Sequence, residues 1–281
     1  MYRSVPPAPA RTDPVPVGRF PLPLARIITR SFDADEAFGP DALRIFNDLG
    51  VAYGMPEQAA GFVGRRRTTF TTMVESLVAE LTDPDDPIGL VVLAHGTPDS
   101  EPHWPACFLA HMLPGDPFTF AVADHGVTTP FLALRIAAEY IRADDLGRAA
   151  VVILEQEEFF CDPALVGQAP MPAENRLVAL VFDRAGTLGT VAVAVTADTE
   201  PELPAVDGSS VLVVGGRLAA TNPPLPSAVV ASAHLPGTGT WSALHDGLDR
   251  WRGEGAEQVT LIDYDPASRV QGRCTLTLRS A

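Results

Sequence analysis

The stretch from Phe120 to Glu155 limits the possible folds more than any other part of the sequence. It begins with a short apolar run, passes through a tight Gly-containing loop, and continues into a long segment with helical periodicity. A second continuous apolar run follows at 149–156. Unbroken apolar runs are typical of strands buried on both faces, as in a sheet covered by helices. The stretch therefore predicts strand, sharp loop, helix and strand within a layered α/β protein.

Similar segments recur on both sides of this stretch. The expected strands are 25–32, 88–96, 118–124, 149–156, 176–184, 190–198, 209–216, 227–234, 257–265 and 272–280. The expected helices are 41–50, 68–83, 105–114, 129–143 and 240–251. Leu132, Ile136 and Tyr140 are spaced by four residues, so we expect them on the buried face of the helix at 129–143, and Leu134, Ala137 and Ala138 should widen that face. Trp241 and Trp251 on the last helix are expected in the core or at a subunit contact.

The chain is expected to form two related halves behind an N-terminal arm. Prolines at positions 6, 7, 9, 14, 16, 21 and 23 exclude the apolar core of a signal peptide and favour an extended arm. We therefore predict a proline-rich arm at 1–24, a first half at 25–160 and a second half at 161–281. No apolar run approaches the roughly 18 residues that a membrane helix needs. A cytoplasmic protein that binds no membrane is expected by default.

The charged residues exclude several classes of function. The net charge is −15, and all 20 basic residues are arginine, so the chain has no lysine. Without lysine there can be no Schiff base to pyridoxal phosphate or to a carbonyl substrate, and no P-loop lysine. A chain this acidic, without a basic stripe, is also not expected to bind nucleic acid.

No metal site or disulfide framework is expected. Cys107, Cys161 and Cys274 are odd in number and irregularly spaced, which fits small buried thiols better than a disulfide or zinc pattern. His95, His103 and His111 recur every eight residues, but this spacing does not place three ligands on one helical face.

The order of these segments resembles the thiolase superfamily, and within it the β-ketoacyl-carrier-protein synthase III family. The matching segments are GFVGRRRTTF at 61–70, VVLAHGTPDSEP at 91–102, the elbow and helix from Phe120, GTGTWSALHDGLDRWRGEGAEQVTLIDYD at 237–265 and GRCTLTL at 272–278. The resemblance covers roughly residues 61–281. It implies a shortened thiolase-like α/β/α/β/α fold of two related halves.

Enzymes of this family use a cysteine, a histidine and an asparagine, and the resemblance maps none of them onto this chain. The cysteine becomes acylated at a helix N-terminus, and the other two stabilise the carbanion and oxyanion of malonyl-thioester decarboxylation. The cysteine position falls on Gly126 or Val127, the histidine turn on Gly215–Gly216–Arg217, and the asparagine on Thr238.

Four other residues are candidates for a relocated catalytic site. Asp124 and His125 lie at the elbow, where His125 could act as a general base; alternatively, Asp124 caps the helix and His125 only fills the vacated space. His95 lies at the end of a buried strand where α/β proteins tend to bind ligands, and the alternative, which we favour, is a turn histidine bonded to backbone. His234 could replace the missing histidine or have a structural role at a strand end.

Arg65, Arg66 and Arg67 form the only basic cluster. The resemblance implies contacts with pantetheine phosphate or an acyl carrier protein here, and the alternative is a solvated turn. We expect a silent subunit in a homo- or heterodimer with an active synthase III homologue, in an acyl-thioester pathway that uses carrier-protein or coenzyme A thioesters and no other cofactor. Two alternatives stay open: an independent acyltransferase or condensing enzyme around His125, and a non-enzymatic binding protein of the same fold.

Overall fold

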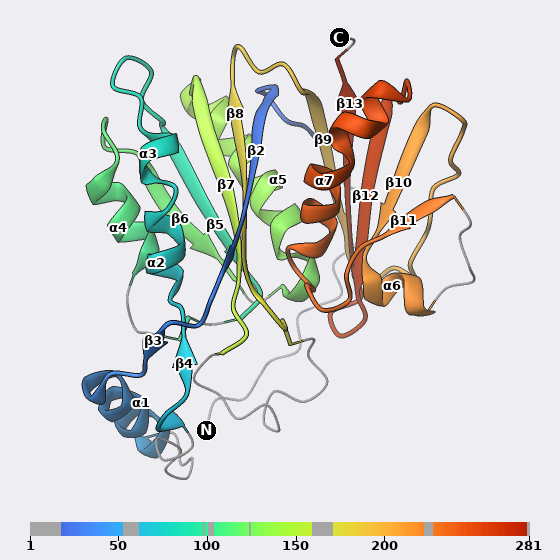
Figure 1. Cartoon of the computed structure of the whole chain (residues 1–281). Coiled ribbons are helices and arrows are strands. Elements are labelled where there is room, and N and C mark those ends of the chain that lie inside the picture. Colours follow the sequence, from blue (N-terminus) through green and yellow to red (C-terminus); the bar gives the residue numbers. More distant parts are fainter. Residues whose placement is uncertain are drawn as a thin grey trace.

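The computed structural model describes residues 18–52, 62–97, 99–100, 104–123, 125–158, 171–221 and 227–279. One large mixed sheet runs through the molecule in the order β11-β10-β12-β13-β9-β2-β8-β7-β5-β6, and β1 also pairs with β9 (Figure 1). Its strands are β1 (Gly18–Arg19), β2 (Leu24–Phe32), β5 (Leu90–His95), β6 (Phe118–Val122), β7 (Arg148–Glu155), β8 (Asn175–Asp183), β9 (Gly189–Thr196), β10 (Ser210–Val214), β11 (Ala228–Val230), β12 (Gln258–Asp265) and β13 (Val270–Leu278). Most of the expected strands are therefore confirmed.

The strand order repeats within the chain. The sheet consists of two units with the same pattern, β6-β5-β7-β8-β2 and β11-β10-β12-β13-β9. In each unit the strand that comes first in the chain, β2 or β9, lies beside the strand that comes last, β8 or β13. In each unit the last strand, β8 or β13, is antiparallel to its neighbours. The two units join where Leu24 of β2 pairs with Gly189 of β9. This order groups β8 with the first unit, whereas the predicted domain boundary at 161 assigns it to the second half.

Two long helices lie between the halves and form the centre of the core. α5 (Thr129–Asp144) contacts β5 and β7 of the first half and β9 and β13 of the second, and α7 (Gly239–Gly253) contacts β2, β10 and β12. Phe131 of α5 packs on Trp241 of α7 with ring centroids 5.1 Å apart. Trp241 and Trp251 are both buried, which confirms the expectation that they belong to the core. One apolar cluster thus spans both halves.

The outer faces of the two halves are covered unequally. On the first half, α2 (Phe70–Glu75), α3 (Val78–Leu81) and α4 (Pro105–Met112) bury a second apolar cluster (Figure 1). On the second half, the small cluster includes only one short helix, α6 (Gly216–Thr221). The layered α/β/α/β/α architecture is therefore confirmed, with a thin final layer.

Several expected boundaries are wrong. The helix predicted at 68–83 is two helices, because the Ser76–Leu77 junction breaks the regular bonding between α2 and α3. The strand predicted at 227–234 ends at Val230, and α6 was not expected. Cys161 lies outside the described residues, Cys274 is buried, and Cys107 is exposed rather than buried.

The exposed surface of α5 also differs from expectation. The buried positions of this helix include Ala133, Leu134, Ala137, Ala138 and Ile141. Tyr140, in contrast, is 38% exposed. The four-residue spacing alone could not tell the face toward the sheet from the face beside the edge strand β6, where Tyr140 contacts Phe118 and Phe120.

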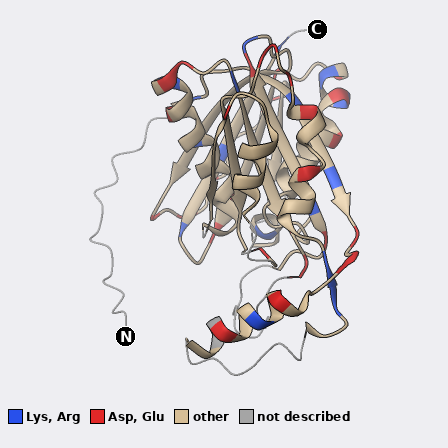
Figure 2. Cartoon of the chain, turned by 90° about the vertical axis from the view of Figure 1, so that its left-hand side faces the viewer, with Lys and Arg blue, Asp and Glu red and all other residues tan. Residues whose placement is uncertain are grey.

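A small lobe projects from the main body below the sheet. α1 (Pro40–Ala52), which continues past the Gly50 end predicted from sequence, packs beside the two-stranded ribbon of β3 (Glu36–Ala37) and β4 (Arg66–Arg67) (Figures 1 and 2). Phe38, Phe46 and Phe62 form its aromatic centre. No helix in the described ranges is long and apolar enough to cross a membrane.

Candidate active site

The loop between β6 and α5 forms the sharp elbow that the sequence predicts. Gly126 begins the 3₁₀ turn Gly126–Thr128 with φ of +52°, a left-handed conformation that glycine adopts without steric cost. Thr129 Oγ1 donates to the Gly126 carbonyl at 2.8 Å and ties the loop to α5. A Cβ at Gly126 would lie 2.8 Å from Oδ2 of Asp265, at the end of β12. The elbow of the first half therefore lies against an acidic side chain of the second.

Glu155 connects β7 to the first turn of α7. Its carboxylate accepts hydrogen bonds from Gly237 N at 2.5 Å, Thr238 N at 2.8 Å and Thr238 Oγ1 at 2.5 Å. Backbone N–H groups at a helix N-terminus favour a negative group, so this carboxylate occupies a natural anion position. Thr238 is the position to which the resemblance assigns the catalytic asparagine. Its hydroxyl is already engaged by a side chain of the same chain.

Asp263, a second buried acid, lies beneath the turn that follows β10. A Cβ on Gly215, the first residue of that turn, would overlap the Asp263 carboxyl group, so only glycine fits there. Asp263 Oδ1 accepts a hydrogen bond from Tyr264 N at 2.9 Å. The turn at Gly215–Arg217, which the resemblance equates with the histidine turn, therefore packs on an acid.

Burial raises the pKa of both acids, and each sits near the other. Burial raises the pKa of Glu155 to about 7, although the bonds from Thr238 and Gly237 and the charge of Arg176 act in the opposite direction. Burial also raises the pKa of Asp263 to about 8; the negative charge of Glu155 adds to this rise, and Arg217 opposes it. Such values keep much of the pair protonated near neutral pH.

The described residues enclose a very small cavity at this junction. Val127 of the elbow, Gly215, Arg217 and Asp263 line it together with Ser232 and Thr240, and its volume is about 10 Å³. This is the space of about one water molecule. The structure thus brings together the elbow, the Gly215 turn and Asp263 around this cavity, and Glu155 holds Thr238 at the start of the neighbouring helix.

The predicted histidines lie around this junction in different settings. His95 ends β5, and its Nδ1 lies 2.7 Å from the Thr97 carbonyl, the backbone bond that a turn histidine makes. The following residue, Gly96, lies against the elbow, because a Cβ there would be 3.2 Å from the Gly126 carbonyl oxygen. His125 is exposed at the start of the elbow turn. Asp124 lies outside the described residues.

His234 is exposed in the turn between β11 and α7. Its backbone carries structural bonds: the N–H donates to Ser232 Oγ at 3.2 Å, and the carbonyl accepts from Ala173 N at 3.0 Å. A catalytic role for His95, His125 or His234 stays a prediction.

The three neighbouring arginines all contact other parts of the chain. Arg65 pairs with Glu158, and its Nε lies 3.2 Å from Oε1. Arg66 donates to the Ala34 carbonyl at 3.1 Å. Arg67 is buried and donates to the Ser100 carbonyl at 3.0 Å, with its guanidinium over the Phe38 ring. A pantetheine or carrier contact through these residues stays a prediction, and Arg67 is the least accessible of the three.

No cluster of three or more histidine, cysteine, aspartate or glutamate side chains within the described ranges could hold a metal ion.

The acidic pair of Glu155 and Asp263 is not among the residues predicted from the sequence. The available signal was an acid at the end of each of two apolar strands, in VVILE at 151–155 and in LIDYD at 261–265. Ends of buried strands are where α/β folds place functional groups.

The comparisons with known proteins agree with this architecture. The sequence matches no protein-family model and no curated protein. Among solved structures, the 3-oxoacyl-(acyl-carrier protein) synthase of Burkholderia xenovorans is similar over 93% of this chain and 95% of its own, with a TM-score of 0.57 and 12% identity. The β-ketoacyl-[acyl carrier protein] synthase III of Thermus thermophilus is similar over 92% and 100%, with a TM-score of 0.55 and 15% identity. A variant of OleA from Xanthomonas campestris is similar over 92% and 99%, with a TM-score of 0.58 and 12% identity.

These matches extend well beyond residues 61–281, where the sequence alone shows the resemblance. Because their identities are so low, they establish architecture rather than activity. The chain has the thiolase-like fold of synthase III-type condensing enzymes.

Proposed function

We propose that this protein is a non-catalytic subunit that pairs with an active condensing enzyme of the synthase III type in acyl-thioester biosynthesis. The observation that carries the proposal is the pair of buried acids, Glu155 and Asp263, at the junction where the resemblance places the catalytic groups. Gly126, Val127, Gly215 and Thr238 occupy the mapped positions, and none of them can act as a thiolate nucleophile or supply an imidazole.

The chemistry of the family explains why such a junction would be inactive. Decarboxylation of a malonyl thioester builds negative charge on a carbon and an oxygen, so an active site offers hydrogen-bond donors and positive groups there. In this chain the donors Gly237 N and Thr238 N already bind the Glu155 carboxylate. The cavity among the described residues, at about 10 Å³, is far too small for a thioester.

The edge strand β6 is a suitable place for a partner to bind. β6 ends the strand order, so within the described chain its far edge pairs with no strand and leaves backbone groups available. Phe118, which is 52% exposed, Phe120 and Tyr140 form a ring cluster with centroids 5.2 to 5.3 Å apart beside this edge. Exposed aromatic groups next to an unpaired edge are suited to a protein interface.

The charge favours an unlike partner. Two copies of a chain with a net charge of −15 repel each other, whereas a less acidic synthase would not. We therefore place an active homologue, rather than a second copy, opposite β6. The partner would supply the nucleophile and the docking surface for an acyl carrier protein.

Activity assays with and without a partner test the proposal. The purified chain alone should neither take up label from an acyl thioester nor decarboxylate a malonyl thioester. Co-expressed with a synthase encoded beside it, it should co-purify and alter that enzyme's turnover or chain-length preference. Turnover by the isolated chain would overturn the proposal, and loss of that turnover by about 10²-fold or more in His125→Ala would establish the relocated site instead. Normal folding without any synthase partner would favour a binding protein.

A further inference from the structure

The thin outer layer of the second half leaves a groove on the sheet. Its walls are Pro204, Ala205 and Val206 on one side and the strands β9, β10, β12 and β13 below, and its volume is about 220 Å³. Drug-sized ligands use pockets of roughly 300–1,000 Å³, so this groove suits a smaller molecule. It lies on the opposite side of the sheet from α5 and α7, away from the acidic pair.

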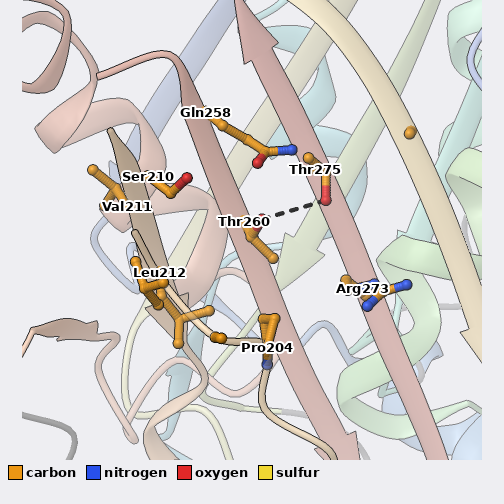
Figure 3. Close-up of a pocket in the computed structure, with 11 residues that line it drawn as sticks. Pro204, Ser210, Val211, Leu212, Gln258, Thr260, Arg273 and Thr275 are labelled. Carbon is orange, nitrogen blue, oxygen red and sulfur yellow. Dashed lines mark hydrogen bonds between the residues drawn. The ribbon is translucent and has the colours of Figure 1, made fainter. Parts of the chain in front are cut away.

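The strand register determines which side chains form the floor. One row of directly paired residues crosses four strands, from Ala192 through Thr275 and Thr260 to Leu212. Gln258 and Ser210 extend the next row. Figure 3 shows Thr260 and Thr275 side by side, with their hydroxyl oxygens 3.3 Å apart. The floor is therefore rich in hydroxyl and amide groups that can donate hydrogen bonds.

Among the residues that the structure describes around the groove, Arg273 is the only charged side chain in its lining. It precedes Thr275 by two residues on β13, so both point to the same face of the sheet, and Arg273 pairs in register with the small Ala194 of β9. It is half-buried, and in the part of the chain that the structure describes it forms no ion pair. A guanidinium presents a planar fork of donors that matches carboxylate and phosphate groups.

Arg273 forms no ion pair with any acid that the structure describes. None of the described residues that line the groove is an aspartate or glutamate, although the chain carries 35 of them. Two acids border the groove: Asp207 accepts a bond from Ser209 Oγ at 3.0 Å beside Ser210, and the backbone of Glu202 bonds with the side chain of Gln271, two residues before Arg273 on β13. The described lining itself thus carries one positive charge and no negative charge.

We propose that this groove binds a small anionic molecule, with Arg273 holding its carboxylate or phosphate group and Thr260, Thr275 and Gln258 bonding its polar atoms. The inference does not depend on the subunit role proposed above, because it concerns a different face of the molecule. Carboxylates and phosphates share the chemistry that Arg273 recognises, so the experiment separates them.

Titration calorimetry of the full chain with inorganic phosphate and, separately, with succinate tests the site. At least one of the two should bind with one-to-one saturation. Arg273→Gln should weaken that binding by about tenfold or more, because a bond to a charged group is lost. Thr260→Val should weaken it by a few-fold through the loss of one neutral hydrogen bond. Preference for phosphate would indicate phosphate esters as ligands, and preference for succinate would indicate carboxylic acids.

A matched control changes the same charge elsewhere. Arg184→Gln removes an exposed arginine outside the groove and should leave binding unchanged. Circular dichroism of each variant establishes that it is folded. Absence of saturable binding of both probes by the wild-type chain would overturn the proposal. Equal weakening by Arg273→Gln and Arg184→Gln would also overturn it, because that result reports only general charge attraction.

Discussion

Glu155 ends strand β7 with its carboxylate against the first turn of α7, so its hydrogen bonds link a strand of the first half to a helix of the second. Three hydrogen-bond donors and the charge of Arg176 favour its charged form, while burial disfavours it and raises its pKa. Buried acids are retained only where their partners hold them, because an unpaired buried charge is costly. Stability at this junction should therefore respond to both pH and hydrogen bonding.

Stability should fall as the pH rises toward 8. The pKa of Glu155 rises from 4.5 to about 7 on folding, and that of Asp263 rises from 3.8 to about 8. At a pH between the unfolded and folded pKa values, the unfolded chain has released a proton that the folded chain keeps. Raising the pH therefore stabilises the unfolded state relative to the folded state. Asp263→Asn removes one of these titrations, so its free energy of unfolding should rise by roughly 3–4 kcal/mol relative to that of the wild type between pH 5 and pH 8. Urea unfolding at both pH values measures this; an equal gain for the exposed Asp249→Asn would contradict it.

The hydroxyl of Thr238 should matter more than its size. Thr238→Val keeps the shape of the side chain but removes the donor to Glu155 Oε2, which leaves a buried acceptor underbonded. We expect a loss of about 1–3 kcal/mol in the free energy of unfolding. Thr238→Ser retains the hydroxyl and should lose less. Urea denaturation of both variants compares them, and equal losses would show that packing of the methyl group dominates.

At the scale of elements, β6 and α5 together decide which side of the protein is available to a partner. Phe118→Glu places a charge in the exposed ring cluster and should weaken association with a synthase partner by about tenfold or more, while leaving the monomer folded. Val63→Glu makes the same kind of change at a site that is 73% exposed in the small lobe and serves as the control. Size-exclusion chromatography of the co-expressed pair measures the effect. Equal association of both variants would exclude the ring cluster from the interface.

At the scale of the whole molecule, the two halves should unfold together. α5 contacts strands of both units, and one apolar cluster extends from Phe20 and Leu22 to Leu261 and Leu276. A shared core makes unfolding of one half costly for the other. Far-ultraviolet and near-ultraviolet circular dichroism should report the same urea midpoint. Two separate midpoints would indicate that the halves are independent domains.

The sequence by itself determined most of the elements, including the elbow at Gly126. Apolar runs such as that at 149–156 become buried strands through local propensity and burial, and the Gly126 elbow requires only a short loop before a helix. The sequence itself shows that positions 126 and 127 are glycine and valine, not cysteine.

Only the tertiary structure decided which groups meet at the junction of the two halves. Glu155 and Thr238 lie 83 positions apart, and they meet because β7 ends beside the first turn of α7. Asp263 reaches the same junction through the order of strands in the second unit. Local patterns carry no information on which strand ends converge, because that depends on long-range pairing in the folded sheet. The same pairing placed Arg273 on a polar, thinly covered face, which its position in the sequence does not indicate.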